Sequence, residues 1–193
     1  MQKIKQILLP YFGIILFITA LFGANILWKL IISGDEWSPV VLLFNSFDIS
    51  APFTAMSEHI TKVVYIIMRF FGNKISIINN IILTYTENGH NVRVVWGCTG
   101  IKQTFIFIII MLLARGNWKN KLWFIPIGVF LCYLINIVRI TAITLIVKNH
   151  QELFEFYHLF VFKYLYYGLI FLIWLFWEEK IYKKERKINK MQT

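Results

Sequence analysis

Long apolar blocks separated by short polar stretches dominate the hydropathy pattern of this chain. Crossing the hydrocarbon core of a bilayer as a helix takes about 20 residues at roughly 1.5 Å each. Four blocks reach or approach this length, at residues 7–32, 99–113, 122–147 and 159–177. The pattern therefore predicts an all-α integral membrane protein with about four transmembrane helices.

Two segments between the first two blocks have a different pattern. Residues 57–72 carry polar side chains at near-helical spacing along one face, which is typical of an amphipathic helix at the outer leaflet. Two β-rich runs, residues 80–87 and 90–96, are separated by Asn88-Gly89, a dipeptide that favours a type I′ turn. We expect an external amphipathic helix and a small β-hairpin here.

The basic residues predict the orientation of the chain in the membrane. They lie before the first block, between the second and third blocks, and in the carboxy-terminal tail: Lys3, Lys5, Arg115, Lys119, Lys121 and residues 178–193. By the positive-inside rule these segments are cytoplasmic. The first block is longer than the apolar region of a signal peptide, so we expect an uncleaved anchor. The prediction is one domain, residues 1–193, with both termini cytoplasmic and an external cap over residues 33–97.

Composition agrees with a membrane protein and narrows the function classes. Apolar residues make up 58% of the 193 residues. The net charge of +10 is concentrated beside the apolar blocks, where anionic lipid and insertion topology account for it better than nucleic acid does. The two cysteines lack CxxC spacing and no HExxH-like motif is present, so we expect neither a disulfide framework nor a metal site.

Cys98 lies between an extended run that ends at Gly97 and the second apolar block. A helix amino terminus presents unpaired N–H groups and the positive end of the helix dipole, and both favour a thiolate over a thiol. One interpretation is a reactive thiol near the external membrane surface. The other is that Cys98 is a small apolar residue that caps a membrane helix.

Arg139 lies inside the third predicted span, where an unneutralised charge costs at least about 2.5 kcal/mol. It falls about five residues, roughly 7 Å, to the external side of the helix midpoint, and Asn136 shares its face. We expect Arg139 to serve a functional site, while a structural arginine that snorkels to the headgroups also fits the position. Cys132 lies deeper, where hydrocarbon disfavours a thiolate, and is expected to be a packing residue.

His158 is the strongest histidine candidate for acid–base chemistry, because it opens the last predicted span. Glu155, three residues earlier, is placed to orient its ring on a helical turn. His150 lies in the same external segment but also fits a solvated loop. The other two histidines, His59 and His90, are expected to be ordinary surface residues.

Cys98, Arg139 and His158 are thus each assigned to the outer half of a different span. A thiol, a guanidinium and an imidazole form a working set for acyl transfer: the histidine assists thiolate formation and protonates the leaving amine, and the arginine stabilises the oxyanion. We predict a membrane thiol peptidase or transpeptidase that acts at the external face. The alternative is a non-enzymatic membrane assembly or transport subunit in which Arg139 is a structural or substrate-pathway charge.

The same residues resemble the motifs of the exosortase/archaeosortase family of membrane-embedded cysteine transpeptidases. The family motifs are a Cys in C-[ST]-G, an Arg in N-x-x-R-[IV] and a His before the final helix. Here they read GCTGIKQ around Cys98, NIVRI around Arg139 and YHLFVFKYLYYG around His158. The resemblance covers roughly residues 96–168, and CTGIKQ and HLFVFKYLYYG are most similar to the compact type F exosortases.

The resemblance implies a substrate class and a location. Substrates would be exported surface proteins with a carboxy-terminal sorting signal, made of a short motif, an apolar helix and a basic cluster. Processing would occur at the outer face of the plasma (inner) membrane without a cofactor. The chain has fewer spans than the larger members, which leaves room for a small membrane partner protein. Beside the three catalytic candidates, we expect supporting or substrate-binding roles for Asn136, Gln103 and Glu155.

Overall fold

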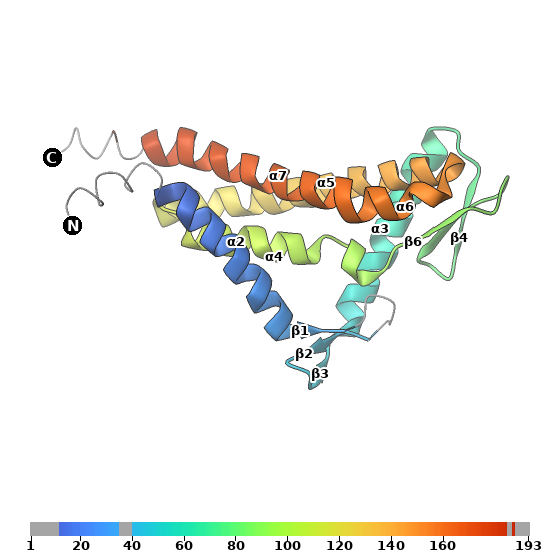
Figure 1. Ribbon diagram of the computed structural model, residues 1–193, viewed down its shortest axis with the longest axis horizontal. Helices are drawn as coiled ribbons and strands as arrows, with labels where there is room; N and C mark the ends of the chain where they lie inside the picture. Colours follow the sequence, from blue (N-terminus) through green and yellow to red (C-terminus); the bar gives the residue numbers. More distant parts are fainter. Residues whose placement is uncertain (1–11, 35–39, 185–186, 188–193) are drawn as a thin grey trace.

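The computed structural model describes residues 12–34, 40–184 and 187. These residues form a mostly helical fold with two small antiparallel sheets, one at the right-hand end of the long helices and one at the lower tip of the molecule (Figure 1). The helical class and the presence of a β-hairpin agree with the sequence pattern. Residues 7–11 of the first predicted span and most of the basic tail beyond residue 184 lie outside the described residues.

Four helices form the long body of the molecule. α4 (Ile101–Leu113), α5 (Trp118–Asn149) and α7 (Phe162–Phe176) run alongside one another, and α2 (Phe12–Ile31) packs obliquely against α4 (Figure 1). α2 and α5 are long and apolar enough to cross a membrane, whereas α4 is a shorter apolar helix. The four helices coincide with the four apolar blocks, and the number of spans stays a prediction.

The last helix combines α-helical and π-helical turns. A 3₁₀ turn, η2 (Gln151–Leu153), leads into α6 (Phe154–Phe156) and then into a π-helical turn, η3 (Tyr157–Val161). α7 follows without a break and ends in a second π-helical segment, η4 (Trp177–Tyr182). The α-helical part is therefore shorter than the predicted span. π-helical turns are rare in proteins, and those that occur are often found at functional sites. η3 is the turn that carries His158.

The predicted amphipathic helix is present as α3 (Ser50–Phe70), which crosses the end of the helical body at a steep angle to α5 (Figure 1). It begins at Ser50 rather than at residue 57, and that boundary was wrong. Ser57 and Thr61 lie on its buried face because their hydroxyls donate to carbonyls one turn earlier, at 3.1 and 2.8 Å. The missed turns, residues 50–56, contain Pro52, which is tolerated in the first turn of a helix but reads as a helix breaker in a sequence.

The predicted hairpin belongs to a three-stranded antiparallel sheet in the order β4-β5-β6. β5 (Ile82–Tyr85) and β6 (Asn91–Arg93) fall within the two predicted runs, and β4 (Ile75–Ile78) was not predicted. The predicted type I′ turn was wrong, since Gly89 has a φ of 74° but Asn88 is not in the left-handed region. The loop is longer than the predicted two residues, since Tyr85 and His90 are the last paired residues and residues 86–89 connect them.

A second small sheet, also not predicted, lies where α2 leads into α3. It consists of β1 (Ile32–Ser33), β2 (Leu42–Leu43) and β3 (Phe47–Asp48), paired antiparallel in that order. Strands of two residues carry too little periodicity to be recognised in a sequence. Apart from Ile32 of β1, both sheets and α3 fall within the segment 33–97 that was predicted to form an external cap.

The β5–β6 hairpin caps the carboxy-terminal end of α5. Asn88 Nδ2 donates to the Lys148 carbonyl at 2.6 Å, and the Tyr85 hydroxyl donates to the Thr144 carbonyl at 2.8 Å. Burial raises the pKa of Tyr85 to about 12, so it remains a donor at neutral pH. The last carbonyls of a helix have no hydrogen-bond donor within the helix. The hairpin supplies such a donor to the Lys148 carbonyl. These bonds hold the sheet against α5.

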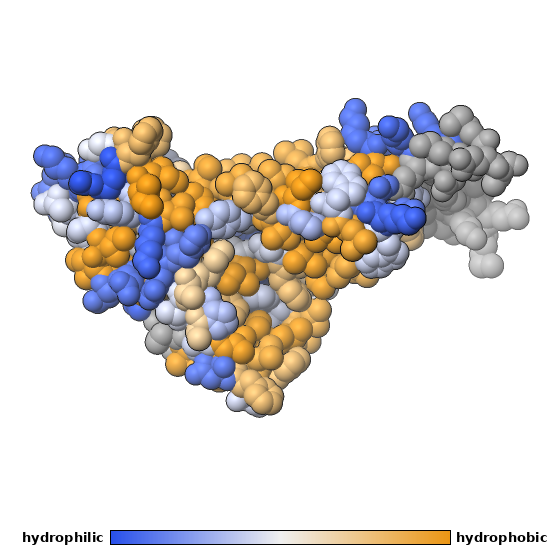
Figure 2. Space-filling model, turned by 180° about the vertical axis from the view of Figure 1, so that it is seen from behind, coloured by the Kyte–Doolittle hydropathy of each residue, from blue (hydrophilic) through white to orange (hydrophobic). Residues whose placement is uncertain are grey.

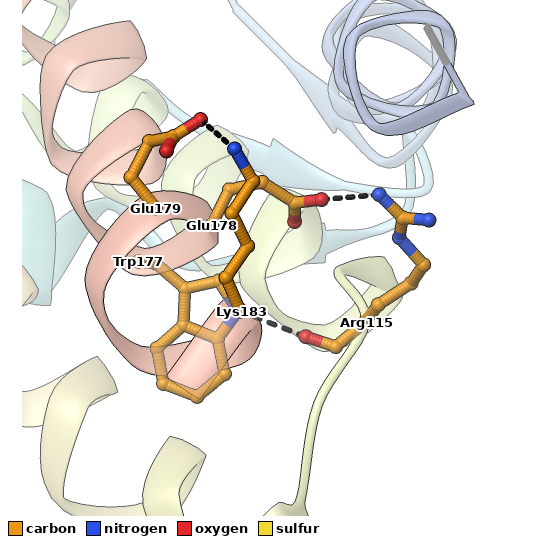
Figure 3. A network of polar contacts seen from close by, with 5 residues as sticks. All are labelled: Arg115, Trp177, Glu178, Glu179 and Lys183. Atoms are coloured by element: carbon orange, nitrogen blue, oxygen red, sulfur yellow. Dashed lines mark hydrogen bonds and ion pairs between the residues drawn. The ribbon is translucent and has the colours of Figure 1, made fainter. Parts of the chain in front are cut away.

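A polar network ties the helices together at the opposite end (Figure 3). The guanidinium of Arg115, which follows α4, pairs with the Glu178 carboxylate, and Trp177 Nε1 donates to the Arg115 carbonyl at 2.9 Å. The buried ammonium of Lys121 donates to the Leu112 carbonyl at 3.0 Å, where the helix dipole of α4 favours a cation. Basic residues predicted only as cytoplasmic charges thus also hold α4 to its neighbours.

On the face shown in Figure 2, apolar residues cover most of the middle, and polar residues gather toward the two ends and at the lower tip. Large apolar side chains are exposed on the outer faces of the long helices, for example Leu30 (70%), Val138 (68%) and Leu172 (55%). In water such a surface would associate or aggregate. It suits helices that face lipid, where no apolar surface needs to be covered.

Candidate active site

Cys98 ends a 3₁₀ turn, η1 (Trp96–Cys98), that connects β6 to α4. Its amide donates to the Val95 carbonyl at 2.9 Å, and its half-buried side chain packs beside the cluster that contains Ile60 and Val64. α4 begins at Ile101, so the expectation that helix starts at residue 99 was two residues early. The thiol lies just before the helix, in a tight turn that fixes its backbone.

Thr99 and Gly100 shape this turn. The Thr99 hydroxyl donates to the Trp96 carbonyl at 2.6 Å. Gly100 has a φ of 78°, in the left-handed region where a side chain is strained. A Cβ at this position would also lie only 3.0 Å from Cγ of Asn136. Glycine is therefore needed both for the backbone conformation and for the close approach of α5.

Asn136 connects the turn to Arg139. Its buried Nδ2 donates to the Cys98 carbonyl at 3.0 Å, and its Oδ1 accepts from the Arg139 guanidinium at 3.4 Å. Arg139 itself is 8% exposed. The two residues share a face of α5, as their spacing predicted. The buried amide thus links the backbone of the thiol-bearing residue to the guanidinium.

Cys98 and Arg139 line one shallow pocket between β6, α5 and α6. It is tight, with a cavity volume of ≈ 10 Å³. The lining residues are Val92, Arg93, Val94, Cys98, Arg139, Ile140, Ile143 and Phe154. Two of the three residues predicted to act on a substrate are therefore brought together. A guanidinium at the same pocket as a thiol can stabilise negative charge that develops on a carbonyl oxygen.

A second cavity of ≈ 240 Å³ also adjoins η1. Its lining combines aromatic and basic side chains from α2, α3, η1 and the start of α4: Trp28, Lys29, Phe53, Trp96 and Lys102. Trp28 and Trp96 each pack against Phe53, with ring centroids 6.4 and 5.8 Å apart. This cavity leaves space next to the thiol-bearing turn for a further chemical group.

Cys132, the rival thiol, is fully buried in the helical core. It packs in the same cluster as Phe107, and its carbonyl accepts a bond of 2.7 Å from the Tyr166 hydroxyl. Neither Cys132 nor Cys98 forms a disulfide. Its burial agrees with the packing role that its depth predicted.

His158 lies in η3, four residues after Phe154 along one helical backbone. Phe154 lines the pocket, so the segment that carries His158 starts at the site. The side chain of His158 lies outside the described part of the structure, and its role stays a prediction. Glu155 is exposed and forms no hydrogen bond or ion pair with the described side chains. The acid that pairs with a histidine in this segment is Glu152, which lies 3.1 Å from His150 Nδ1.

Gln103 lies in the first turn of α4 and is half-buried. Its Oε1 atom is buried and has no hydrogen-bond partner among the residues that the structure describes. A buried acceptor without a partner is costly and often marks a place where a ligand or water binds. The supporting role of Gln103 stays a prediction, and the buried acceptor is a physical reason for it.

The two histidines expected at the surface both have structural partners. His59 on α3 lies 2.9 Å from the hydroxyl of Tyr133 on α5. His90 Nδ1 lies 3.0 Å from the Val147 carbonyl, at the end of α5. Both rings therefore connect elements of the segment 33–97 to α5 rather than acting as free surface groups.

Sequence reasoning missed two segments that contribute to the site. Val92 of β6 and Val94, which follows the strand, bury their side chains and bring the strand to the pocket, and Phe154 reaches the pocket from α6. Valine and phenylalanine are too frequent in this chain to stand out. The alternation of exposed and buried residues along β6 was visible in the sequence, but which helix it faced was not.

Gly100→Ala should destabilise the protein by about 1–2 kcal/mol, the usual cost of the left-handed conformation for a residue with a Cβ, and more if Asn136 must move. Unfolding in detergent, followed by intrinsic fluorescence, measures the change. Gly23→Ala is the matched control, because a Cβ at Gly23 in α2 would meet no atom within 4 Å. It should be neutral or slightly stabilising. Equal stability of the two variants would contradict the strain assigned to Gly100.

A comparison with protein families identifies the class of this protein. A family model described as transmembrane exosortase matches residues 1–177. The chain therefore belongs to the transmembrane exosortase family. No curated protein and no solved structure matches it. Membership agrees with the resemblance of the Cys98, Arg139 and His158 motifs, and it makes this a membrane protein of a family of sorting-signal transpeptidases.

Proposed function

We propose that this protein is a membrane-embedded cysteine peptidase or transpeptidase that cleaves the carboxy-terminal sorting signals of exported proteins at the outer face of the plasma membrane. The observation that carries the proposal is the shared pocket of Cys98 and Arg139, with Asn136 bonded to both residues. A purely structural arginine would not need to lie beside the family's motif cysteine.

In the proposed reaction, the Cys98 thiolate attacks the carbonyl carbon of the scissile peptide bond, and a C–S bond forms. The oxyanion that develops is stabilised by the Arg139 guanidinium. The C–N bond then breaks, and protonated His158 gives its proton to the leaving amine. Water or an amine then attacks the resulting thioester and gives a proton to the now neutral His158, and the C–S bond breaks to release the Cys98 thiolate. Hydrolysis and transpeptidation differ only in this last nucleophile.

The arrangement of the helices supports four spans with alternating direction. A Cβ at Gly13, in the first turn of α2, would lie 2.9 Å from both Arg115 and Glu178, so α2 starts where α4 and α7 end. At the other end of α2, Trp28 packs 5.3 Å from Phe105 near the start of α4. The end that holds Arg115 is rich in basic residues, which favours the cytoplasmic side. Cys98 would then be external.

Accessibility labelling tests this orientation. In a variant without Cys98 and Cys132, a cysteine in place of exposed Glu87 at the hairpin tip should react with a membrane-impermeant maleimide on intact cells. A cysteine in place of Lys183, near the end of the last helix, should react only after the cells are opened. The reverse pattern would place the proposed site in the cytoplasm and rule out action on exported proteins at the outer face.

Alkylation of Cys98 separates an enzyme from an assembly subunit. With Cys132→Ala as background, Cys98 should react with iodoacetamide at neutral pH faster than free cysteine does, because activated thiols carry more thiolate. Cys132, measured in a Cys98→Ala background, is the buried control and should react slowly. A Cys98 rate at or below that of free cysteine would favour the non-enzymatic alternative.

A further inference from the structure

We infer that the open edge of β6 binds the peptide substrate as an added strand that leads to Cys98. The inference rests on the proposed function and deepens it by assigning where the peptide lies. In the described part of the chain, β6 is the last strand of the order β4-β5-β6, so only one of its edges is paired with another strand. Unpaired strand edges are ready templates for an extended chain.

The register of the sheet shows which backbone groups face this edge. The Tyr85 amide donates to the His90 carbonyl at 2.9 Å, and the Val94 amide donates to the Ile81 carbonyl at 2.8 Å. In an antiparallel pair, hydrogen-bonded positions alternate with positions that point away from the partner strand. Positions 90, 92 and 94 therefore bond to β5. The amides and carbonyls of Asn91 and Arg93 point to the opposite edge.

This edge leads directly to the proposed chemistry. Arg93 lines the same pocket as Cys98 and Arg139. The buried side chains of Val92 and Val94 anchor β6, and Val92 packs with Ile143 of α5. A peptide strand paired with Arg93 would therefore be held on a rigid support, with one of its next carbonyls near the thiol. Such precise placement of the reacting carbonyl is a main source of rate enhancement.

The geometry also indicates the kind of peptide that fits. Bonds to the Arg93 amide and carbonyl read only the backbone of the peptide, so they tolerate many side chains. They need an extended segment whose paired residue has an N–H, which excludes proline at that position. The partner is thus an extended, non-helical stretch of polypeptide at the membrane surface, next to the scissile bond.

The test uses the full chain in nanodiscs, with Cys132→Ala and ¹⁵N-labelled arginine. The chain has five arginines (Arg69, Arg93, Arg115, Arg139 and Arg186), and Arg93→Lys assigns the Arg93 signal. The probe is an acetylated peptide of alternating Thr and Val with an activated cysteine at its end, attached to Cys98 as a mixed disulfide. Hydrogen exchange of the Arg93 amide should slow about tenfold or more, while the Arg69 amide on α3 should not change.

Two probes with N-methyl groups on alternate backbone nitrogens are the matched controls. One register of methylation should remove the slowing, and the other should retain it, because only every second nitrogen of a paired strand faces its partner. Unchanged Arg93 exchange with every probe would overturn the inference and leave the proposed function intact. If Cys98 formed no disulfide, the proposed function would be contradicted. In that case, hydrogen exchange of the Arg93 amide is measured with the peptide added free at millimolar concentration. Slower exchange would support binding at the β6 edge, and unchanged exchange would overturn it.

Discussion

Cys98→Ala will abolish processing of a cognate substrate while the protein still inserts into the membrane. The residue would be the nucleophile, and removing a nucleophile typically costs about 10³-fold or more in turnover. The half-buried side chain lies in a turn held by backbone bonds and by Thr99, so alanine should not disturb the fold. The measurement is the mass shift of an exported reporter that carries the sorting tail of a protein encoded beside this one.

Cys132→Ala is the control for this experiment, since it removes the only other thiol of the chain. Cys132 is fully buried in the core, so the variant should lose some stability but retain processing within about threefold. Loss of processing in Cys132→Ala together with activity in Cys98→Ala would show that the wrong thiol was assigned. Loss in both variants, with normal amounts of protein in the membrane, would point to a structural role for both residues.

Arg139→Gln will lower turnover by about 10²–10³-fold, the usual effect of removing one oxyanion donor. Glutamine keeps a polar group for Asn136 but removes the positive charge beside Cys98. Arg139→Lys should recover only part of the activity, because an ammonium does not reproduce the planar fork of the guanidinium that bonds Asn136. Rates of reporter processing at saturating and at limiting substrate levels separate an effect on turnover from an effect on substrate binding.

Arg69→Lys is the matched control for the arginine series, since Arg69 is exposed on α3 and lies outside the pocket. It should process the reporter at the normal rate. Full activity of a folded Arg139→Gln protein would show that the reaction does not need the positive charge of Arg139, and it would contradict the mechanism. The assembly-subunit alternative would then explain the buried arginine better than catalysis does.

The helical elements were the most predictable part of this fold. Apolar blocks identified α2, α4, α5 and α7, because a lipid-facing helix must be apolar along most of its length. α3 was recognised from its polar face, but its start was misplaced because Pro52 lies in its first turn and reads as a helix breaker in a sequence. β4 and the two-residue strands were missed, since short strands depend on partners that lie elsewhere in the chain.

The candidate site was partly predictable as well. Charge topology and helical rise placed Cys98 and Arg139 at similar depth, and the three-residue spacing placed Asn136 on the face of Arg139. Nothing in the sequence specified that the Asn136 amide would reach the Cys98 carbonyl, a contact across 38 residues. Depth is a one-dimensional quantity, whereas a contact also needs the rotation of each helix about its axis.

The sequence by itself thus determined the helical class, the family motifs and the residue types at the site, because hydropathy, charge and short motifs are local properties. Only the tertiary structure decided that β6, α5 and α6 enclose Cys98 and Arg139 in one pocket, and that β6 leaves an edge open beside them. The physical reason is that side-chain packing between distant segments selects one rotation and register for each element. In this protein Gly100 has no side chain to block the approach, so the turn that carries Cys98 packs closely against Asn136 of α5.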